Sequence, residues 1–343
     1  MQNHMVMPCF TISDDFRMMR SFYFFLTAVF ARIVDSQIYL PQRIVSNHEL
    51  SKSLDTSHDW IVKRTGIHAR HILADDETAS SMALSACQRL LAEQNIDPSL
   101  IGSIIVATST SHTAMPSIAC QLANSLGIND AFSLDVNAAC SGFLYALSLG
   151  NDRIRYHNDH YSLIVGVDAM SRITDWSDRS TAVLFGDGAG AILLKSDPDT
   201  GLIAIRCGSE SRGEELLRVH GDLHSSQPCA LSMDGKEVFR FAVDRLYKTS
   251  QDLLVLNEID PQSIDWVVPH QANSRILDYV TKQFDISPQR VVKTMAQHAN
   301  TSAASIPLAL HSLRDSGKLL RGQRLLFKAF GAGFTWGAAV CEY

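Results

Sequence analysis

The sequence predicts an α/β fold made of two similar halves, and three observations carry this prediction. Helix-like and strand-like patterns alternate from about residue 78 to the C-terminal end. A polar stretch, KSDPDTG (195–201), interrupts them as a candidate linker. At 343 residues the chain is long for one simple domain but sufficient for two halves that share a core. We therefore expect an N-terminal extension (1-30), a first βα-rich half (31-197) and a second (198-343).

The elements of the first half follow from the spacing of apolar residues. A helix is expected over 78–94, and the acidic residues just before it favour a helix N-terminus. The run SIIVAT (103–108) is short and apolar, as in a strand buried on both faces. The other elements expected in this half are strands over 31–38, 131–136, 162–167 and 190–194, a helix over 117–126, and a helix that begins at Cys140.

The second half repeats this alternation after the polar stretch. Its longest helical pattern covers 237–256. Strands are expected over 264–268 and 324–329, and helices over 272–284 and 302–314. No repeat is visible residue by residue, so the duplication is inferred from the order of the elements alone.

The N-terminal extension combines two basic residues, Arg17 and Arg20, with an apolar run over 22–30. This pattern is similar to the basic and apolar regions of an export signal. The run is shorter than the roughly 20 residues that cross a bilayer. Nothing downstream suggests a secreted protein, so we favour an extension that leads into the first strand. We expect no membrane association and a cytoplasmic location.

Composition excludes several classes of protein. Hydrophobic residues make up 46% and charged residues 19% of the chain, which is typical of a globular protein rather than a disordered one. The net charge of -6 argues against nucleic-acid binding by the protein as a whole. The seven cysteines are widely spaced without a CxxC pair, so neither a disulfide framework nor a metal site is expected.

One cysteine stands where a strand gives way to a helix. In DVNAACSG (135–142) an apolar strand ends, small residues follow, and Cys140 opens the next helix. A helix N-terminus carries about half a positive charge, which favours the thiolate and should lower the pKa of the thiol. Cys140 is therefore a candidate nucleophile, although most cysteines outside active sites are buried and inert.

Two polar residues of the second half stand at similar junctions. In VVPHQANSR (267–275), His270 directly follows a strand, and strand ends in open α/β sheets are where ligands collect. In QHANTS (297–302), Asn300 precedes a helix. Taken singly, His270 could be a satisfied structural histidine and Asn300 a cap or turn residue.

Two glycine-rich stretches complete the set of motifs. AFGAGFTWG (329–337) follows a strand, and its small residues would let backbone N–H groups approach a ligand or would form a tight turn. FGDGAGA (185–191) allows the same two interpretations. It lacks the GK[ST] ending of a phosphate-binding loop.

Together and in this order, the motifs resemble those of the β-ketoacyl-acyl carrier protein synthase III family of the thiolase superfamily. The resemblance runs from about residue 31 to residue 343 and includes DWIVKRTG (59–66) and NTSAAS (300–305). It implies a thiolase-like α/β fold in which duplicated βα halves pack as layers in the order αβαβα. It also implies that the protein is a homodimer.

The resemblance implies the following chemistry. Cys140 takes the acyl group of an acyl-CoA primer, and His270 and Asn300 stabilise the enolate formed when malonyl-acyl carrier protein loses CO2. The backbone N–H groups of Cys140 and Ala332 form an oxyanion hole. Asparagine rather than a second histidine at position 300 indicates a CoA-primed, initiating enzyme of fatty acid synthesis, which requires no cofactor.

Binding residues are implied in the same way. The CoA-binding residues would be Trp60, Arg64, Arg179, Gly235 and Asn273. The acyl pocket would include Phe185 and, across the dimer interface, Met115. Acyl carrier protein would contact Arg240, Gln271, Ala272, Asn273, Ser274, Arg275 and Lys282.

Three positions depart from the family pattern. The first strand, ARIVDSQIYLP, lacks the usual glycines, and Ala332 replaces the middle glycine of a common GGG form. Met115 stands where acetyl-selective members carry phenylalanine, and a narrower, flexible methionine suggests primers longer than acetyl.

Three alternatives stay open: a condensing enzyme of a secondary-metabolite pathway, a hydrolase that uses Cys140 and His270, and a non-enzymatic carrier-protein binder.

Overall fold

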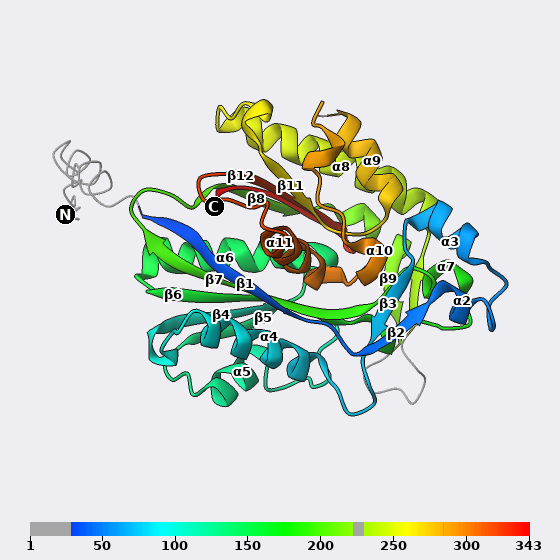
Figure 1. The fold of residues 1–343 in the computed structure, drawn as a ribbon, viewed down its shortest axis with the longest axis horizontal. Helices are drawn as coiled ribbons and strands as arrows, with labels where there is room; N and C mark the ends of the chain where they lie inside the picture. Colours follow the sequence, from blue (N-terminus) through cyan, green and yellow to red (C-terminus); the bar gives the residue numbers. More distant parts are fainter. Residues whose placement is uncertain (1–28, 222–229, 284) are drawn as a thin grey trace, which may run out of the picture.

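Two β-sheets lie at the centre of the molecule (Figure 1). The computed structural model describes residues 29–221, 230–283 and 285–343. The basic and apolar features predicted for the N-terminal extension lie almost entirely outside the described residues, and so does the expected end of the 272–284 helix.

The first sheet has five strands in the order β1-β7-β6-β4-β5. The central strands β4 and β6 are parallel and almost continuously buried, as their uninterrupted apolar runs predict. β1 and β6 both pair antiparallel with β7. The bounds are β1 Phe30–Tyr39, β4 Ile101–Ala107, β5 Phe132–Val136, β6 Tyr161–Ala169 and β7 Asp187–Asp197.

The second sheet has four strands in the order β11-β12-β13-β8. β11 and β12 are parallel, and β13 pairs antiparallel with both β12 and β8. The bounds are β8 Leu202–Ser209, β11 Trp266–Pro269, β12 Arg324–Gly331 and β13 Thr335–Glu342. All strands of the first sheet precede residue 198 and all strands of the second follow it, which supports the proposal of two halves that meet there.

Helices cover both sheets and fill the space between them (Figure 1). α4 and α5 pack on the outer face of the first sheet, and α8 and α9 on the outer face of the second. α6 and α11 lie between the sheets in the largest apolar core. The predicted order αβαβα is therefore confirmed. The bounds are α4 Ala79–Glu93, α5 Ile118–Leu126, α6 Gly142–His157, α8 Gly235–Leu256, α9 Ser274–Gln283 and α11 Ser305–Asp315.

Local capping explains where these helices begin. The Thr78 side chain accepts from the N–H of Ser81, and the Ser81 side chain returns a hydrogen bond to the Thr78 backbone, which forms a capping box at α4. Ser117 caps α5, and Asp234 caps α8 by accepting from two backbone N–H groups. The helices predicted over 78–94, 117–126 and 237–256 are thus confirmed to within about two residues.

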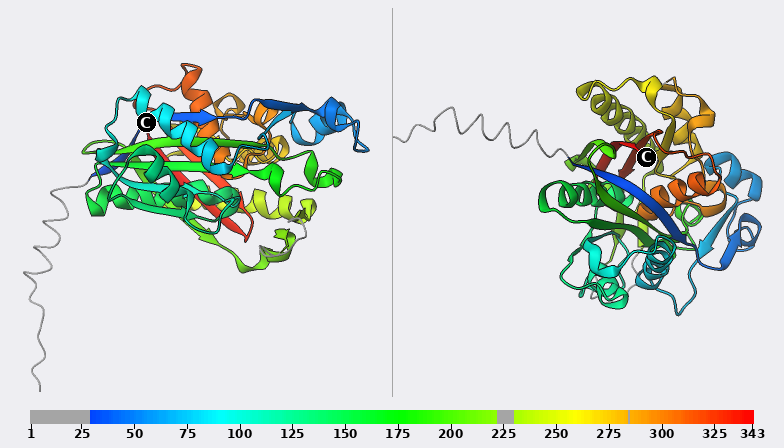
Figure 2. Two further views of the ribbon diagram at one scale, coloured as in Figure 1. Left: turned by 90° about the horizontal axis from the view of Figure 1, so that it is seen from below. Right: turned by 60° about the vertical axis from the view of Figure 1, so that its left-hand side comes forward.

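Smaller elements form a lobe at one end of the molecule in all three views (Figures 1 and 2). They were not expected from the sequence, because elements of four to eight residues carry too little periodicity to recognise. The lobe contains β2 Arg43–Ser46, α2 Asn47–Leu50, α3 His58–Thr65 and β3 Ala69–Ile72. The remaining short elements are α7 Arg179–Ala182, β9 Leu217–His220, β10 Ala230–Met233 and α10 Met295–His298.

The expected linker is shorter than its composition indicated. β7 continues to Asp197, and Lys195 and Asp197 pair with β6 and β1 respectively. An ion pair of 3.0 Å between Arg32 and Asp197 holds this end of the strand, and the Asp197 carboxylate also accepts from two backbone N–H groups of the turn. Only residues 198–201 connect the two sheets.

Residues 187–191 of FGDGAGA begin β7, so Gly188 and Gly190 form no tight turn, whereas Phe185, just before the strand, lines a cavity. A Cβ at Gly190 would lie 2.7 Å from the Pro307 side chain, and a Cβ at Gly188 would lie 3.1 Å from Leu308. The glycines therefore let α11 pack closely on β7. The sequence indicated close approach at this position but could not identify a helix as the group that approaches.

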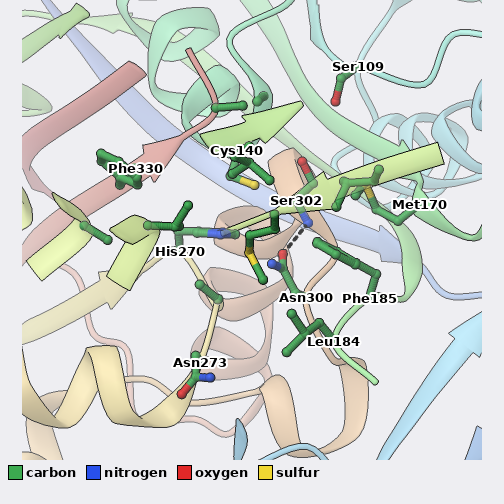
Figure 3. Close-up of a pocket in the computed structure, with 18 of the residues that line it drawn as sticks. Ser109, Cys140, Met170, Leu184, Phe185, His270, Asn273, Asn300, Ser302 and Phe330 are labelled. Atoms are coloured by element: carbon green, nitrogen blue, oxygen red, sulfur yellow. Dashed lines mark hydrogen bonds between the residues drawn. The ribbon is translucent and has the colours of Figure 1, made fainter. Parts of the chain in front are cut away.

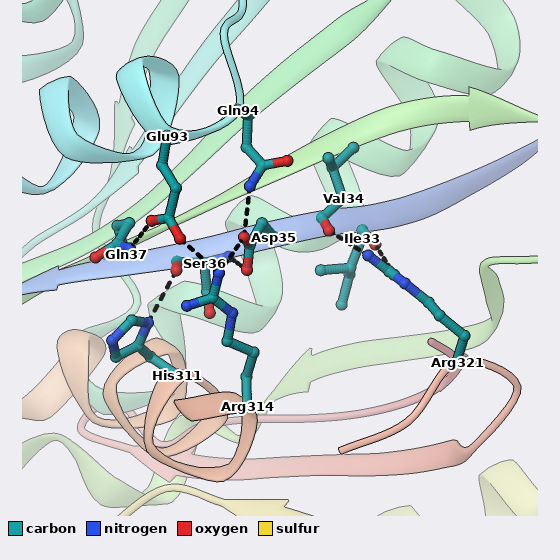
Figure 4. A network of polar contacts seen from close by, with 10 residues as sticks. All are labelled: Ile33, Val34, Asp35, Ser36, Gln37, Glu93, Gln94, His311, Arg314 and Arg321. Carbon is teal, nitrogen blue, oxygen red and sulfur yellow. Dashed lines mark hydrogen bonds and ion pairs between the residues drawn. The ribbon is translucent and has the colours of Figure 1, made fainter. Parts of the chain in front are cut away.

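The first strand, which lacks the expected glycines, carries a polar network (Figure 4). The buried carboxylate of Asp35 accepts from Gln94 Nε2 and from Arg314 Nη2, each at 2.6 Å. Arg314 also bonds Glu93 at 2.8 Å, and Glu93 in turn accepts from Gln37. The network joins β1 to α4 on one side and α11 on the other.

Replacing Arg314 with alanine will lower the free energy of unfolding by about 2–3 kcal/mol, because it leaves the buried Asp35 charge without its cation. Urea unfolding measures the change. The matched control is Arg43→Ala, which breaks a pair whose side chains are 64% and 48% exposed, so it will cost less than about 0.5 kcal/mol. Equal costs for the two variants would contradict the role of the network.

Candidate active site

Cys140 lies in a single turn of 3-10 helix, Ala139–Ser141, that joins β5 to α6. The expected helix start at Cys140 is therefore off by two residues, since α6 begins at Gly142. Ala139 has a positive φ of 46°, which turns the chain sharply before Cys140. Gly331 makes this turn possible, because a Cβ there would lie only 2.8 Å from the Cys140 nitrogen.

The Cys140 thiol is not activated in the way that the sequence suggested. Burial raises its pKa to about 12, and the negative charge of Asp168 adds to this effect. A contact with the Ser302 side chain lowers the pKa by more than the Asp168 charge raises it, but by less than burial raises it. Withdrawal of a thiolate from water thus outweighs the partial positive charge of the α6 N-terminus. The side chain of Cys140 is therefore a thiol at neutral pH.

His270 directly follows β11, as expected, and extends the parallel ladder through a hydrogen bond of 2.8 Å from its N–H to the Lys328 carbonyl. The side chain is 6% exposed, and burial lowers its pKa to about 4. The imidazole is therefore neutral at physiological pH. Nδ1 lies 2.6 Å from the Ser305 hydroxyl. When Ser305 donates to Nδ1, the proton resides on Nε2, which is the tautomer that can donate toward the pocket.

The backbone of Asn300 is held by two hydrogen bonds to neighbouring segments. Its N–H donates to the Leu184 carbonyl at 2.9 Å, and its carbonyl accepts from the N–H of Gly186 at 3.1 Å. The side-chain oxygen accepts from the N–H of Ser302 at 2.9 Å. This bond uses one acceptor position of the amide oxygen and leaves the NH2 group to donate into the pocket.

The three side chains meet in one cavity of about 360 Å³ (Figure 3). Figure 3 shows Cys140, His270 and Asn300 facing one another, with Ser302 beside Cys140 and hydrogen-bonded to Asn300. The sequence named eight residues that line this cavity: Cys140, Phe185, Gly235, His270, Ala272, Asn273, Asn300 and Ala332. Most of the other lining residues are apolar, among them Met170, Leu184, Leu217, Leu231, Met233 and Phe330.

Ala332 lies beside the Cys140 turn and has a negative φ, so its methyl group is accommodated without a left-handed backbone. The Thr335 hydroxyl connects the two segments. It makes hydrogen bonds of 2.9 Å to the carbonyls of both Ala138 and Ala332 and is 2.7 Å from the Ser141 hydroxyl. The backbone segments of Cys140 and Ala332 are therefore fixed relative to each other.

Trp60, Arg64 and Arg179 form a cluster on the lobe, outside the cavity lining. The guanidinium carbons of Arg64 and Arg179 lie 5.4 and 5.1 Å from the centroid of the Trp60 ring. The structure thus brings Arg179 to Trp60 and Arg64, which lie one turn apart on α3. Ser274 links the cluster to the cavity, because it follows the lining residue Asn273 and packs on Gly66 at the end of α3.

The residues expected to contact a carrier protein divide into two groups. Arg240, Arg275 and Lys282 are exposed, although Arg240 pairs with Glu237 at 2.9 Å. Gln271 is 1% exposed and is a correction: its amide bonds the carbonyls of Pro269 and Val292, so it cannot reach a partner. The position of Gln271 next to His270 in the sequence does not indicate that its side chain points inward.

Met115 does not line the cavity of its own chain. It lies on the loop between β4 and α5 and is 82% exposed. Sequence reasoning missed three polar residues around the side chains of Cys140, His270 and Asn300, namely Asp168, Ser302 and Ser305. The two serines belong to the NTSAAS stretch, where only Asn300 had been given a role.

Among the described residues, no group of three or more His, Cys, Asp or Glu could hold a metal ion, and no helix could cross a bilayer.

Backbone strain marks the approach to Asn300. Ala299 has φ 57° and ψ −157°, a combination that is nearly restricted to glycine and costs about 1–3 kcal/mol. We expect Ala299→Gly to raise the free energy of unfolding by about 1 kcal/mol, because relief of strain exceeds the added chain entropy. In the same urea titration Ala92→Gly, on the exposed face of α4, should instead lose about 0.5–1 kcal/mol. A loss at both positions would contradict the strain at Ala299.

Comparisons with known proteins agree with this geometry. Residues 134–211 match the family described as 3-oxoacyl-[acyl-carrier-protein] synthase III, and residues 254–343 match its C-terminal domain. A β-ketoacyl-[acyl-carrier-protein] synthase III of Xylella fastidiosa is 43% identical over 320 residues, which cover 92% of this chain and 99% of the relative.

Solved structures give the same result. The 3-oxoacyl-(acyl carrier protein) synthase III of Pseudomonas aeruginosa PAO1 aligns with a TM-score of 0.86 and 37% identity over 92% of this chain and 98% of that one. The priming β-ketosynthase of the R1128 polyketide pathway aligns with a TM-score of 0.88 and 32% identity over 91% and 96%. The chain belongs to the β-ketoacyl-acyl carrier protein synthase III family and is an acyltransferase of the condensing type.

Proposed function

We propose that the chain joins an acyl-CoA primer to malonyl-acyl carrier protein by a decarboxylative Claisen condensation and so initiates fatty acid synthesis. The observation that carries the proposal is the meeting of Cys140, His270 and Asn300 in one apolar cavity. No cofactor is required, because the loss of CO2 from the malonyl group drives the formation of the carbon–carbon bond.

The first step loads the primer. The Cys140 sulfur attacks the thioester carbonyl and loses its proton, and CoA leaves as a thiol once it has gained a proton. The negative charge on the carbonyl oxygen is stabilised by the N–H groups of Cys140 and Ala332. The hydrogen bonds of Thr335 to both segments support this pair of donors.

The second step extends the primer. His270 Nε2–H and the Asn300 amide donate to the thioester oxygen of malonyl as it loses CO2 and becomes an enolate. The enolate carbon attacks the acyl-Cys140 carbonyl, and the Cys140 sulfur leaves and regains a proton. The buried, neutral state of His270 supports a role as hydrogen-bond donor rather than as a charged acid.

CoA and the carrier protein would approach the cavity from the same side. Trp60, with Arg64 and Arg179 close to its ring, offers an aromatic ring and two cations to a nucleotide. Gly235 and Asn273 line the cavity that would hold the pantetheine arm. Acyl carrier protein, which is acidic, would contact exposed Arg240, Arg275 and Lys282 and the segment of Ala272, Asn273 and Ser274.

A homodimer is part of the proposal. β5 is an edge strand of the first sheet and has an exposed phenylalanine, Phe132, at its start. The neighbouring loop presents Met115, which is 82% exposed and does not line the cavity of its own chain. Pairing of two copies along β5 would cover this edge and could place Met115 against the acyl pocket of the second copy, beside Phe185.

The test is mass spectrometry of the protein after incubation with acetyl-, butyryl- and octanoyl-CoA. We expect a thioester on Cys140, absent from Cys140→Ser, and adducts with primers longer than acetyl because Met115 is flexible and narrow. If no acyl-CoA forms a thioester, the proposed function fails. A sharp preference for acetyl would reject only the longer primers.

The alternative of a secondary-metabolite enzyme shares all of these steps. The similarity to a priming polyketide ketosynthase keeps the alternative in view, but its 32% identity is lower than the 43% shared with a synthase III. We favour fatty acid synthesis in the cytoplasm. Competition between carrier proteins of the two pathways would decide between these roles.

A further inference from the structure

Asp168 is a buried carboxylate that the condensing reaction, as described, does not use. It stands near the C-terminal end of β6 and is fully buried. Its Oδ1 accepts from the N–H of Ser109 at 2.8 Å and from the Thr110 hydroxyl at 2.9 Å. The hydroxyls of Ser109 and Thr108 lie 3.2 and 3.3 Å from the same oxygen. Oδ2 accepts from the N–H of Ala303 at 3.1 Å.

These donors come from two segments that border the cavity. Ser109 lines the cavity itself and belongs to the loop that leads to Met115. Ala303 belongs to the turn Ser302–Ala304, which follows Asn300 and precedes α11. Gly166, on the same strand as Asp168, lets this turn approach, because a Cβ there would lie 2.3 Å from the Ala303 carbonyl. Asp168 therefore holds the turn against β6.

Ser302 is the residue of this turn that touches all three catalytic groups. Its N–H binds the Asn300 side chain at 2.9 Å, its backbone contacts the His270 imidazole, and its side chain contacts the Cys140 thiol. The same side chain interacts with the Asp168 carboxylate. Its positive φ of 50° is unusual for serine and must be maintained by the surroundings.

We propose that Asp168 is a positioning residue for condensation, which holds the Ser302 turn so that Asn300 and His270 can share one substrate oxygen. The inference rests on the proposed condensing function. Asparagine cannot replace the carboxylate without loss, because its NH2 group would face N–H and O–H donors. Burial raises the pKa of Asp168, whereas the N–H groups of Ser109 and Ala303, which can only donate, favour the ionised carboxylate.

The negative charge of Asp168 also acts on Cys140, and this effect predicts the direction in which the reactivity of Cys140 should change. Burial is the main reason why the pKa of Cys140 is raised, and the Asp168 carboxylate contributes further. Loss of the charge should therefore make Cys140 easier to ionise while it disturbs the donors of the enolate. A purely structural residue would not move these two properties in opposite directions.

The experiment compares the full chain with Asp168→Asn. Alkylation of Cys140 by iodoacetamide is followed by mass spectrometry from pH 6 to 10, and CO2 release from malonyl-acyl carrier protein gives kcat and KM. We expect alkylation at pH 8 to be about 3–10-fold faster in the variant and kcat to fall at least about 10-fold, with KM within about threefold.

Asp187→Asn is the matched control. Asp187 is also fully buried in the same sheet and accepts from the N–H groups of Leu73 and Ser171, but among the described residues Ser302 is not one of its hydrogen-bond partners. Its alkylation profile should be that of the wild type. If Asp168→Asn leaves both rates within twofold, or lowers both together, the inference is overturned. Failure of the wild type to condense would instead refute the proposed function.

Ser302→Gly keeps the test decisive if Asp168→Asn does not fold. Glycine tolerates the positive φ and keeps the N–H that binds Asn300, but it removes the hydroxyl between Asp168 and Cys140. We expect slower alkylation of Cys140, because the contact that favours thiolate is lost while the Asp168 charge stays. We also expect at least a threefold fall in CO2 release. Unchanged values for both would overturn the inference.

Discussion

Replacing His270 with alanine will slow the decarboxylation of malonyl-acyl carrier protein at least about 100-fold and will leave Cys140 able to accept an acyl group. His270 is 6% exposed and its pKa is lowered to about 4 by burial, so it is neutral and, in the proposed mechanism, would donate to the enolate oxygen. Removal of one such donor from an oxyanion hole costs about 2.7–4 kcal/mol, or roughly 100- to 1,000-fold in rate. Asn300→Ala should behave alike.

The measurement pairs CO2 release with the intact mass of the protein after incubation with acyl-CoA. Cys140→Ser is the matched control and should give the reverse pattern: no acyl adduct, with decarboxylation retained. Should His270→Ala lose acylation and decarboxylation in equal proportion, His270 would be the base that activates Cys140. That result would favour the hydrolase-like pairing of the two residues over their separate roles.

The central prediction from the sequence concerned residues that end or begin regular elements. Cys140, His270 and Asn300 each stand at such a junction, and a strand or helix pattern indicates where the junction falls. The structure brings these three residues to one cavity. Their order along the chain also indicated the family, which the comparisons confirm.

The supporting polar residues could not be found in this way. Asp168 lies inside a buried strand, and its donors come from segments about 60 and 135 residues away in the sequence. Ser305 is the first residue of α11, and only the fold brings it to His270. Serine and aspartate are common in turns and caps, so their type carries no sign of such distant partners.

The ionisation of Cys140 was predicted in the wrong direction for a related reason. The motif DVNAACSG indicates a helix N-terminus, which favours thiolate, but it contains no information on how deeply the sulfur is buried. Burial depends on the packing of α6 between the two sheets and on the turn above Gly331. These contacts are made by residues far away in the sequence, and they dominate the pKa of the thiol.

The raised pKa of Cys140 predicts a second large effect, which is a strong increase in the reactivity of this thiol with pH. Iodoacetamide reacts with the thiolate, and a group with a pKa of about 12 is almost entirely a thiol at neutral pH. The thiolate fraction then rises about tenfold for each pH unit below 12. Alkylation of Cys140 should therefore accelerate about 1,000-fold between pH 7 and pH 10 without levelling off.

Peptide mapping by mass spectrometry assigns the adduct to Cys140, and free cysteine in the same tube provides the reference. The reference rate should level off above its ordinary pKa of about 8.5, whereas the Cys140 rate should continue to rise. A plateau for Cys140 near pH 7 would mean that the α6 N-terminus outweighs burial. The thiol would then be poised to react before any substrate binds, and Asp168 would have little influence on it. A continued rise would instead indicate that Cys140 loses its proton in the same step as it attacks the primer. The buried sulfur then never holds the negative charge alone, because the charge passes to the carbonyl oxygen of the acyl group.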